Sequence, residues 1–170
     1  LGTQDGLAGD RVASVCESAD GAVWLGTDGG LCRFDPGASA PQARWRYLRA
    51  RDGLLPGQVV AIRQDRSGNL WFACSGNRLP GGLCRYDGVS VIRYPAGGSL
   101  TGESVDDLYI DTAGCLWTAT SDGVFRLDPD SVLNFGPPEG APQGTIFNLA
   151  ISADGMVWAL GKDALARFDG

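Results

Sequence analysis

The chain has 170 residues, of which 44% are hydrophobic and 20% charged, a composition typical of a globular protein. Its formal net charge of −6 argues against nucleic-acid binding, because phosphates need a basic surface. No apolar run approaches the roughly 20 residues that span a bilayer, so no membrane insertion is expected. The 26 glycines are spread between short apolar runs, which predicts a nearly all-β protein of short strands joined by tight turns.

One seven-residue segment occurs four times along the chain, each time with a tryptophan at its fourth position. The four copies are residues 21–27, 68–74, 114–120 and 155–161. A second shared segment follows each copy and contains Arg, one further residue and Asp. It covers residues 31–35, 83–87, 124–128 and 165–169. Self-similarity at intervals of about 40–50 residues is typical of a repeat architecture.

Each repeat predicts a sheet of antiparallel strands. The first strand ends in a Gly-containing turn, the Trp segment forms the second strand, and the Arg-x-Asp segment forms the third. A more variable fourth strand is expected at residues 44–48 and at residues 89–94. Asp20 with Gly21, and Asp154 with Gly155, predict two-residue hairpin turns. Four such strands make a propeller blade, so the predicted fold is an all-β propeller with four blade repeats.

The repeat boundaries are expected at residues 12–58, 59–104, 105–145 and 146–170, within a single propeller array that covers residues 1–170. Residues 1–11 align with the segment before the second repeat, which predicts the connector from a preceding blade. The last repeat has no residues for a fourth strand, which leaves unpaired backbone groups at its edge. We therefore expect the chain to form a homo-oligomer or to be part of a larger ring.

The repeated Trp, Arg and Asp columns are expected to be structural. A Trp at one position of a buried strand is more typical of the core between blades than of a platform for stacking sugars. The charged columns favour bonds to one another or to the backbone at blade edges. The columns are Trp24, Trp71, Trp117 and Trp158; Arg33, Arg85, Arg126 and Arg167; and Asp35, Asp87, Asp128 and Asp169.

The second repeat carries extra residues between its second and third strands, at residues 75–81. Such insertions often map to the binding face of a repeat protein, although a neutral surface insertion fits the sequence equally well. In a propeller this loop shares one rim with the connectors that precede the first strands. We therefore predict a ligand-binding rim made of Asp10, Arg11, Gln58, Asn77, Arg78, Glu103 and Asp106.

The sequence contains no histidine. This removes Ser-His-Asp and Cys-His catalysis, His-ligated zinc and the usual general base near pH 7. The Asp-Gly turns lack the spacing of an EF-hand calcium loop. No catalytic residue, no metal and no cofactor is therefore expected. The five cysteines show no metal-binding spacing and are expected to be buried free thiols, which argues mildly against an oxidising compartment.

The repeats resemble the two-component regulator propeller repeat, whose pattern is Val-x-x-Ile-x-x-Asp-x-x-Gly-x-Leu-Trp-Ile-Gly-Thr-x-x-Gly-Leu. Residues 59–74 and 105–127 match it closely, residues 12–35 nearly as well, and the fourth copy more weakly at residues 161–164. The resemblance implies a propeller from the extracellular sensor half of a bacterial hybrid histidine kinase, often one that recognises carbohydrate. It also favours a periplasmic or extracellular location.

A weaker resemblance links residues 68–72 to the streptogramin lyase propellers, which rely on histidine and a metal. Since this chain has no histidine, lyase activity within it is not expected. The sequence therefore favours a non-enzymatic sensing or ligand-binding module, with carbohydrate or another small ligand as its partner. The alternative is a protein-interaction scaffold that uses the propeller rim, and a fragment of a propeller lyase is the less favoured third interpretation.

Overall fold

The computed structural model describes residues 2–40, 43–75, 81–94, 104–128 and 131–169. The fold divides into two compact units, Leu1–Gly102 and Glu103–Gly170. No helix among the described residues has the length and apolarity needed to cross a membrane.

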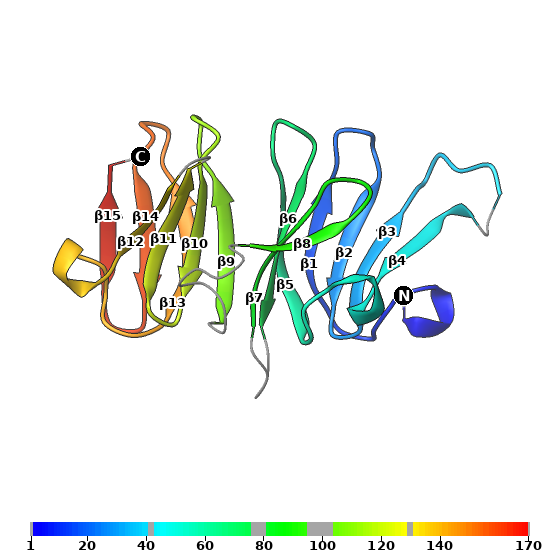
Figure 1. The fold of residues 1–170 in the computed structure, drawn as a ribbon, viewed down its shortest axis with the longest axis horizontal. Coiled ribbons are helices and arrows are strands. Elements are labelled where there is room, and N and C mark those ends of the chain that lie inside the picture. The colour runs from blue at the N-terminus through cyan, green and yellow to red at the C-terminus, as the bar shows by residue number, and fades with distance from the viewer. Residues whose placement is uncertain (1, 41–42, 76–80, 95–103, 129–130, 170) are drawn as a thin grey trace. The chain divides into compact units, whose positions relative to one another are not determined.

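The first unit contains two sheets of four antiparallel strands, and in each sheet the strands lie in chain order (Figure 1). The strands of the first sheet are β1 (Val12–Glu17), β2 (Val23–Thr27), β3 (Gly30–Phe34) and β4 (Trp45–Leu48). Those of the second sheet are β5 (Gln58–Gln64), β6 (Leu70–Ser75), β7 (Gly82–Tyr86) and β8 (Val91–Tyr94).

The second unit contains one sheet of four strands and one of three, again in chain order within the described residues. The four-stranded sheet consists of β9 (Val105–Ile110), β10 (Leu116–Thr120), β11 (Gly123–Asp128) and β12 (Ser131–Phe135). The three-stranded sheet consists of β13 (Ile146–Ile151), β14 (Val157–Gly161) and β15 (Leu165–Phe168). The predicted all-β fold of blade repeats is confirmed, including the missing fourth strand of the last blade.

The turns between the first and second strands are longer than the sequence analysis predicts. Ser18 and Ala22 close the first of them: the Ser18 N–H donates to the Ala22 carbonyl at 2.9 Å, and the Gly21 N–H donates back to the Ser18 carbonyl at 2.8 Å. The loop therefore has three residues, with Gly21 last at a φ of 78°. The prediction of two-residue turns at Asp20–Gly21 and Asp154–Gly155 is wrong. Only the glycine needs a positive φ, as in a type I turn followed by a glycine bulge.

A hydrogen bond from the tryptophan indole locks this turn in three of the four sheets. The indole N–H donates to the side chain six residues earlier, at 3.2 Å for Trp24 to Ser18 and at 2.9 Å for both Trp71 to Asp65 and Trp117 to Asp111. The carboxylates of Asp65 and Asp111 also accept backbone N–H groups of their own turns. One polar side chain thus satisfies the indole and also shapes the turn.

The four tryptophans lie on the equivalent strands β2, β6, β10 and β14, as predicted, but their burial differs. Trp117 is fully buried and Trp24 is 6% exposed. Trp71 and Trp158 are half-buried. Trp24 and Trp117 each contact an aromatic ring of the following sheet, with centroid distances of 5.9 Å to Tyr86 and 6.5 Å to Phe168. The core assignment is therefore confirmed for the first sheet of each unit.

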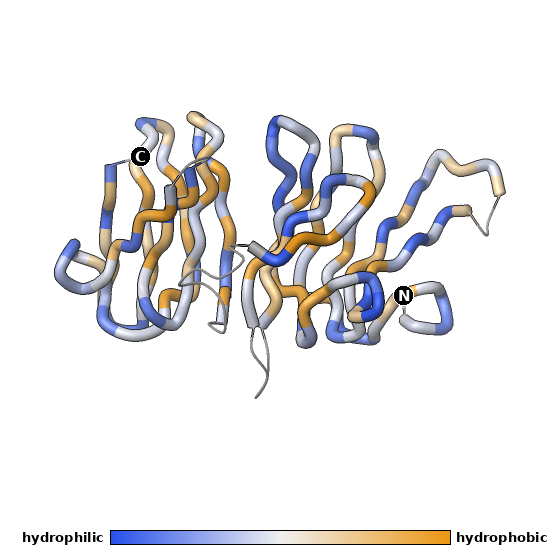
Figure 2. Tube along the Cα trace, in the orientation of Figure 1, coloured by the Kyte–Doolittle hydropathy of each residue, from blue (hydrophilic) through white to orange (hydrophobic). Residues whose placement is uncertain are grey.

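Polar contacts also join the two sheets within each unit. In the first unit the Ser14 hydroxyl donates to the Val59 carbonyl at 3.1 Å. In the second unit the buried Asp107 accepts from the Asn148 side-chain amide at 2.9 Å and from the Leu149 N–H at 3.0 Å. Hydrophobic residues lie mainly along the strands, and many hydrophilic residues lie at the turns (Figure 2).

Three short turns lead into the first strands and have the same construction. They are η1 (Thr3–Asp5), η3 (Ala50–Asp52) and η4 (Pro137–Glu139). In each, the last carboxylate accepts the backbone N–H three residues earlier, at 2.8–2.9 Å. A glycine with a φ of 95–105° follows each turn. The first connector and the segment before the second repeat therefore share one local structure.

We expect Trp117→Ala to lower the free energy of unfolding by about 3–5 kcal/mol, because it empties a fully buried aromatic site. Trp158→Ala should cost clearly less, since Trp158 is half-buried. Denaturant titration of both variants measures the difference, and equal losses would contradict the burial assignment.

We expect Asp111→Ala to cost about 1–3 kcal/mol, because it leaves the buried Trp117 indole N–H without an acceptor. The double variant Asp111→Ser with Ala113→Asp copies the Ser18 and Asp20 arrangement of the first sheet and should recover part of this loss. The exposed Asp163→Ala is the control, expected within about 0.5 kcal/mol of the unsubstituted chain. No recovery in the double variant would show that the two turn designs are not interchangeable.

Candidate functional site

A cavity of about 420 Å³ lies within the first unit, between its two sheets and beside the turns that join the first and second strands. Charged, aromatic and aliphatic side chains line it, among them Asp20, Arg33, Asp35, Arg46, Leu48 and Tyr86. Clefts of about 300–1,000 Å³ with a few convergent polar groups are typical of small-molecule sites.

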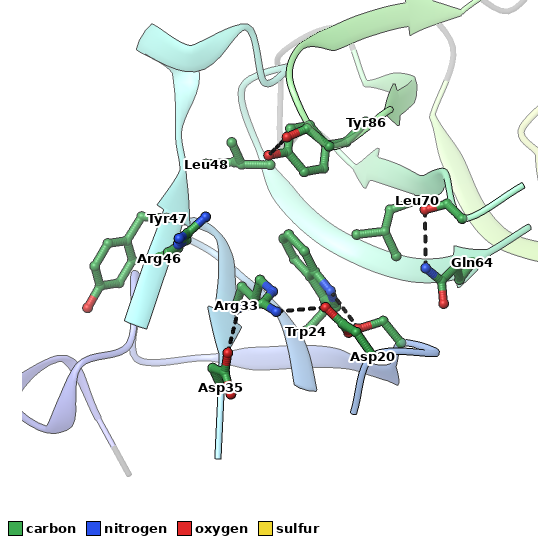
Figure 3. A pocket seen from close by; sticks show the side chains of 13 residues that line it. Asp20, Trp24, Arg33, Asp35, Arg46, Tyr47, Leu48, Gln64, Leu70 and Tyr86 are labelled. Atoms are coloured by element: carbon green, nitrogen blue, oxygen red, sulfur yellow. Dashed lines mark hydrogen bonds and ion pairs between the residues drawn. The ribbon is translucent and has the colours of Figure 1, made fainter. Parts of the chain in front are cut away.

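Arg33 of β3 joins two carboxylates at the mouth of this cavity (Figure 3). Its Nη2 lies 2.7 Å from Asp20 Oδ2, and its Nη1 lies 3.3 Å from Asp35 Oδ2. The Arg33 side chain is 18% exposed, whereas that of Asp20 is 58% exposed. The predicted bonding between the Arg and Asp columns is therefore confirmed at Arg33 and Asp35, and again at Arg126 and Asp128.

Arg33 differs from the other three arginines of its column. The guanidinium carbons of Arg85, Arg126 and Arg167 lie 5.8, 5.6 and 5.9 Å from the ring centroids of Trp71, Trp117 and Trp158. These are cation–π distances. Arg33 instead reaches Asp20 and faces the cavity.

The environment of Asp20 stabilises its ionised form. The Ser18 hydroxyl, followed by the Arg33 guanidinium, lowers the pKa of the Asp20 carboxyl to about 2. Both groups donate hydrogen bonds to the carboxylate, which favours the charged state. At neutral pH this side chain is a permanent hydrogen-bond acceptor.

The wall toward the second sheet combines an aromatic pair with an amide. Trp24 meets the edge of Tyr86, whose hydroxyl donates to the Gly88 carbonyl at 2.7 Å. The Gln64 side chain accepts from the Ala19 N–H at 2.7 Å and donates to the Gly68 carbonyl at 3.1 Å. Gln64 thereby ties the turns of the two sheets together and closes this end of the cavity.

Arg46 lies directly opposite Arg33 in the register of β3 and β4. It is exposed, as expected for a solvated arginine of an outer strand. Within the described residues it makes no ion pair and no side-chain hydrogen bond. Its neighbour Tyr47 turns toward the N-terminal segment and donates to the Gly6 carbonyl at 2.9 Å, which anchors β4 from its other face. Arg46 is thus the free donor of the cavity.

Asp10 and Arg11 of the predicted binding rim lie at the other end of the strands of the first sheet. Asp10 is exposed. Its carboxylate accepts a hydrogen bond from the Thr3 N–H at 2.9 Å, and this hydrogen bond lowers the pKa of the Asp10 carboxyl. The Arg11 N–H donates to Asp28, in the turn between β2 and β3, at 3.3 Å. The connector and this turn therefore share one edge of the first sheet, as the propeller geometry predicts.

The remaining rim residues are dispersed over both units. Gln58 begins β5 opposite Ser75, at the corresponding edge of the second sheet. Asp106 belongs to the second unit, where it accepts from the Ser104 hydroxyl at 3.2 Å and burial raises the pKa of its carboxyl. Asn77, Arg78 and Glu103 lie outside the described residues. The structure places Asp10 and Arg11 on one sheet, and the binding role of all seven residues stays a prediction.

The cysteines carry free thiols, and three of the five, Cys32, Cys74 and Cys84, are buried. Cys16 and Cys115 are half-buried, so the expectation of buried thiols is confirmed for three positions only. No group of three metal-ligating side chains converges in the described part of the chain.

A family model matches two stretches of the chain. The model described as "Two component regulator propeller" matches residues 6–29 and 53–76. These two stretches are similar to the repeats of that family. Each begins at the glycine that ends a connector turn and continues through the turn and strand that carry the Trp. They thus contain Asp20, Trp24, Gln64 and Leu70 of the cavity.

Several solved structures share the fold of this chain. The extracellular domain of a hybrid two component system from B. thetaiotaomicron matches with a TM-score of 0.78 and 17% identity, over 98% of this chain and 23% of its own. PorZ of Porphyromonas gingivalis, a surface component of the type-IX secretion system, matches with a TM-score of 0.71 and 16% identity, over 95% and 26%.

A lyase shows the same likeness at a lower level. Virginiamycin B lyase from Staphylococcus aureus matches with a TM-score of 0.66 and 14% identity, over 96% of this chain and 57% of its own. At these identities the likeness establishes the β-propeller fold alone. The chain spans only about a quarter of the first two structures, at 23% and 26% of their length. No curated protein sequence matches the chain significantly.

The cavity was not predicted from the sequence. Arg33 and Asp35 were expected to be structural, because each belongs to a repeated column. The signal that was available is a difference within one column: Leu48 stands where the third repeat has Phe135. Recognising it requires the strand register, which the variable length of the fourth strands hides from the sequence.

We expect NMR titration of the Asp20 carboxyl to give a pKa of about 2. Ser18→Ala and Arg33→Gln should each raise this value toward the ordinary pKa of about 3.9, because each removes a donor to the carboxylate. Because the folded pKa is depressed, the ionised carboxylate stabilises the fold fully above about pH 4, and this stabilisation disappears as the pH falls toward 2. An unshifted Asp20 in the unsubstituted chain would show that the ion cluster does not persist in solution.

Proposed function

We propose that this chain is a non-enzymatic, ligand-sensing part of a β-propeller that recognises carbohydrate in a bacterial signalling system. The observation that carries the proposal is the match of the two component regulator propeller model to residues 6–29 and 53–76. The fold relatives described as extracellular domains of two component systems support it.

The chemistry of the cavity favours binding over catalysis. A general acid or base works best when its pKa lies near the working pH. The pKa of Asp20 is held at about 2, far below neutrality, by donors that also fix its orientation. Such a carboxylate accepts hydrogen bonds from a ligand hydroxyl and transfers protons poorly.

The rim of Asp10, Arg11, Gln58, Asn77, Arg78, Glu103 and Asp106 is kept as a proposed contact surface. Its described members in the first unit, Asp10, Arg11 and Gln58, lie at the strand ends away from the cavity and are exposed or half-buried. Arg11→Ala and Gln58→Ala remove two of its side chains without touching the cavity. They separate the two surfaces in any binding experiment.

We expect the 170-residue chain to bind one or more glycans on an immobilised glycan array, and to release each bound glycan with its mass unchanged. Array fluorescence and mass spectrometry of the eluted glycan are the two measurements. An array without any bound glycan would contradict carbohydrate recognition and favour the protein-scaffold alternative. A glycan recovered with altered mass would contradict the non-enzymatic assignment.

A further inference from the structure

The two units allow the same inter-sheet space to be compared in one chain. Strand pairing places Leu48 opposite Leu31 in the first sheet and Phe135 opposite Val124 in the third. Because Leu31 and Val124 occupy the same position of their repeats, Leu48 and Phe135 are equivalent residues of the outer strands. By the same alignment, Tyr86 is equivalent to Phe168.

In the second unit this space is filled by aromatic rings. Phe135 lies 5.5 Å from Trp117 and 5.2 Å from Phe168, measured between ring centroids, and Trp117 lies 6.5 Å from Phe168. Phe135 thus occupies the position between the tryptophan of one sheet and the aromatic residue of the next. Such contacts are typical of a close-packed core.

In the first unit the smaller Leu48 stands at the position of Phe135. The ring centroids of Trp24 and Tyr86 still lie 5.9 Å apart. Among the described residues of the first unit, no third ring joins this pair. The cavity of about 420 Å³ lies beside it. The smaller outer-strand side chain is one of the differences between the two units at this position.

The side chains around this space are also more polar in the first unit. Arg46 occupies the register position of Leu133, since they pair with the equivalent residues Arg33 and Arg126. Gln64 occupies the position of Ile151, which packs against the core of the second unit. A void left by chance in an apolar core would keep apolar walls. Here the loss of volume coincides with a gain of hydrogen-bonding groups.

The charged groups of the cavity balance. Arg33 and Arg46 carry two positive charges, and Asp20 and Asp35 carry two negative charges, so the four side chains sum to zero. The site therefore has no net charge that would favour an ion of either sign. A neutral ligand with hydroxyl groups can donate to the carboxylates and accept from the arginines at once. The aliphatic Leu48 and Leu70 give its apolar ring face a surface to contact.

We propose that the cavity between the first two sheets is the binding site for a neutral mono- or disaccharide. The saccharide class rests on the proposed function, whereas the site and the neutral charge rest on the cavity itself. Arg46 is the free donor for a sugar hydroxyl, Asp20 and Asp35 are acceptors, and Leu48 sets the volume available.

The test uses the full 170-residue chain and isothermal titration calorimetry with five probes. Four are neutral disaccharides (maltose, cellobiose, lactose and xylobiose), and the fifth is the acidic digalacturonate. Leu48→Phe narrows the cavity with the larger residue that the third sheet already holds at this position. Arg46→Gln keeps the cavity and removes the charged donor. Phe135→Leu in the second unit is the matched control, and Arg11→Ala and Gln58→Ala test the rim separately.

We expect at least one neutral disaccharide to bind, and to bind more tightly than digalacturonate. Leu48→Phe should abolish this binding and Arg46→Gln should weaken it about tenfold, in line with the loss of one charged hydrogen bond. The control variant Phe135→Leu should keep the affinity of the unsubstituted chain. Thermal unfolding of Leu48→Phe shows whether the variant is folded, and Arg46→Gln tests the site independently of that result.

Each of the following results overturns the inference: no neutral disaccharide binds, digalacturonate binds best, Arg46→Gln keeps full affinity, or a folded Leu48→Phe binds normally. Loss of affinity in the rim variants would also overturn it and would place the site on the rim. If both cavity variants still bind glycan on the array, the cavity is not the binding site, but the proposed function is not contradicted. An array without binding defeats the proposed function as well.

Discussion

In three of the four sheets, the tryptophan and its hydrogen bond to the preceding turn connect the local and the tertiary structure of this chain. The indole N–H of Trp117 donates to Asp111 at 2.9 Å, while its ring packs against Phe135 and Phe168. A buried indole must find an acceptor, and the turn six residues earlier always lies within reach because the two strands form one hairpin. The same residue therefore sets the hairpin and fills the space between sheets. Ser18 in place of Asp65 or Asp111 shows that the acceptor can change while the geometry remains.

The repeats differ in sequence at positions where packing between the sheets does not require a particular side chain. The second strands carry the tryptophans and the tightly packed contacts, such as Gly26, where an added Cβ would lie 2.4 Å from the Val59 carbonyl oxygen. The outer strands β4 and β12 have no such restriction, since only one edge of each is paired within its sheet. Leu48 and Arg46 replace Phe135 and Leu133 there, and the space between sheets changes from an aromatic core to a polar cavity.

Electrostatics keeps that cavity polar and ordered. Arg33 is shared between Asp20 and Asp35, and the Ser18 hydroxyl and the Arg33 guanidinium lower the pKa of Asp20 to about 2. The exposure of Asp20 keeps the contribution of this ion pair to stability small. Its consequence is geometric: two acceptors and one donor are oriented before any ligand arrives, which reduces the ordering cost of binding. The open Arg46 adds a donor that no protein group satisfies.

Local patterns in the sequence were sufficient to predict the repeat, the strand order within each sheet, the equivalence of the four tryptophans and the missing outer strand of the last blade. Each depends on residues close together in the chain, whose spacing follows directly from strand and turn geometry. The three-residue turns, the half-burial of Trp71 and Trp158, and the cavity beside Arg33 were decided only in the tertiary structure. Turn length depends on which backbone groups form hydrogen bonds, and an Asp-Gly pair in the sequence does not determine this. Burial and cavity volume depend on which side chain of the neighbouring sheet lies opposite, and that side chain belongs to a different repeat.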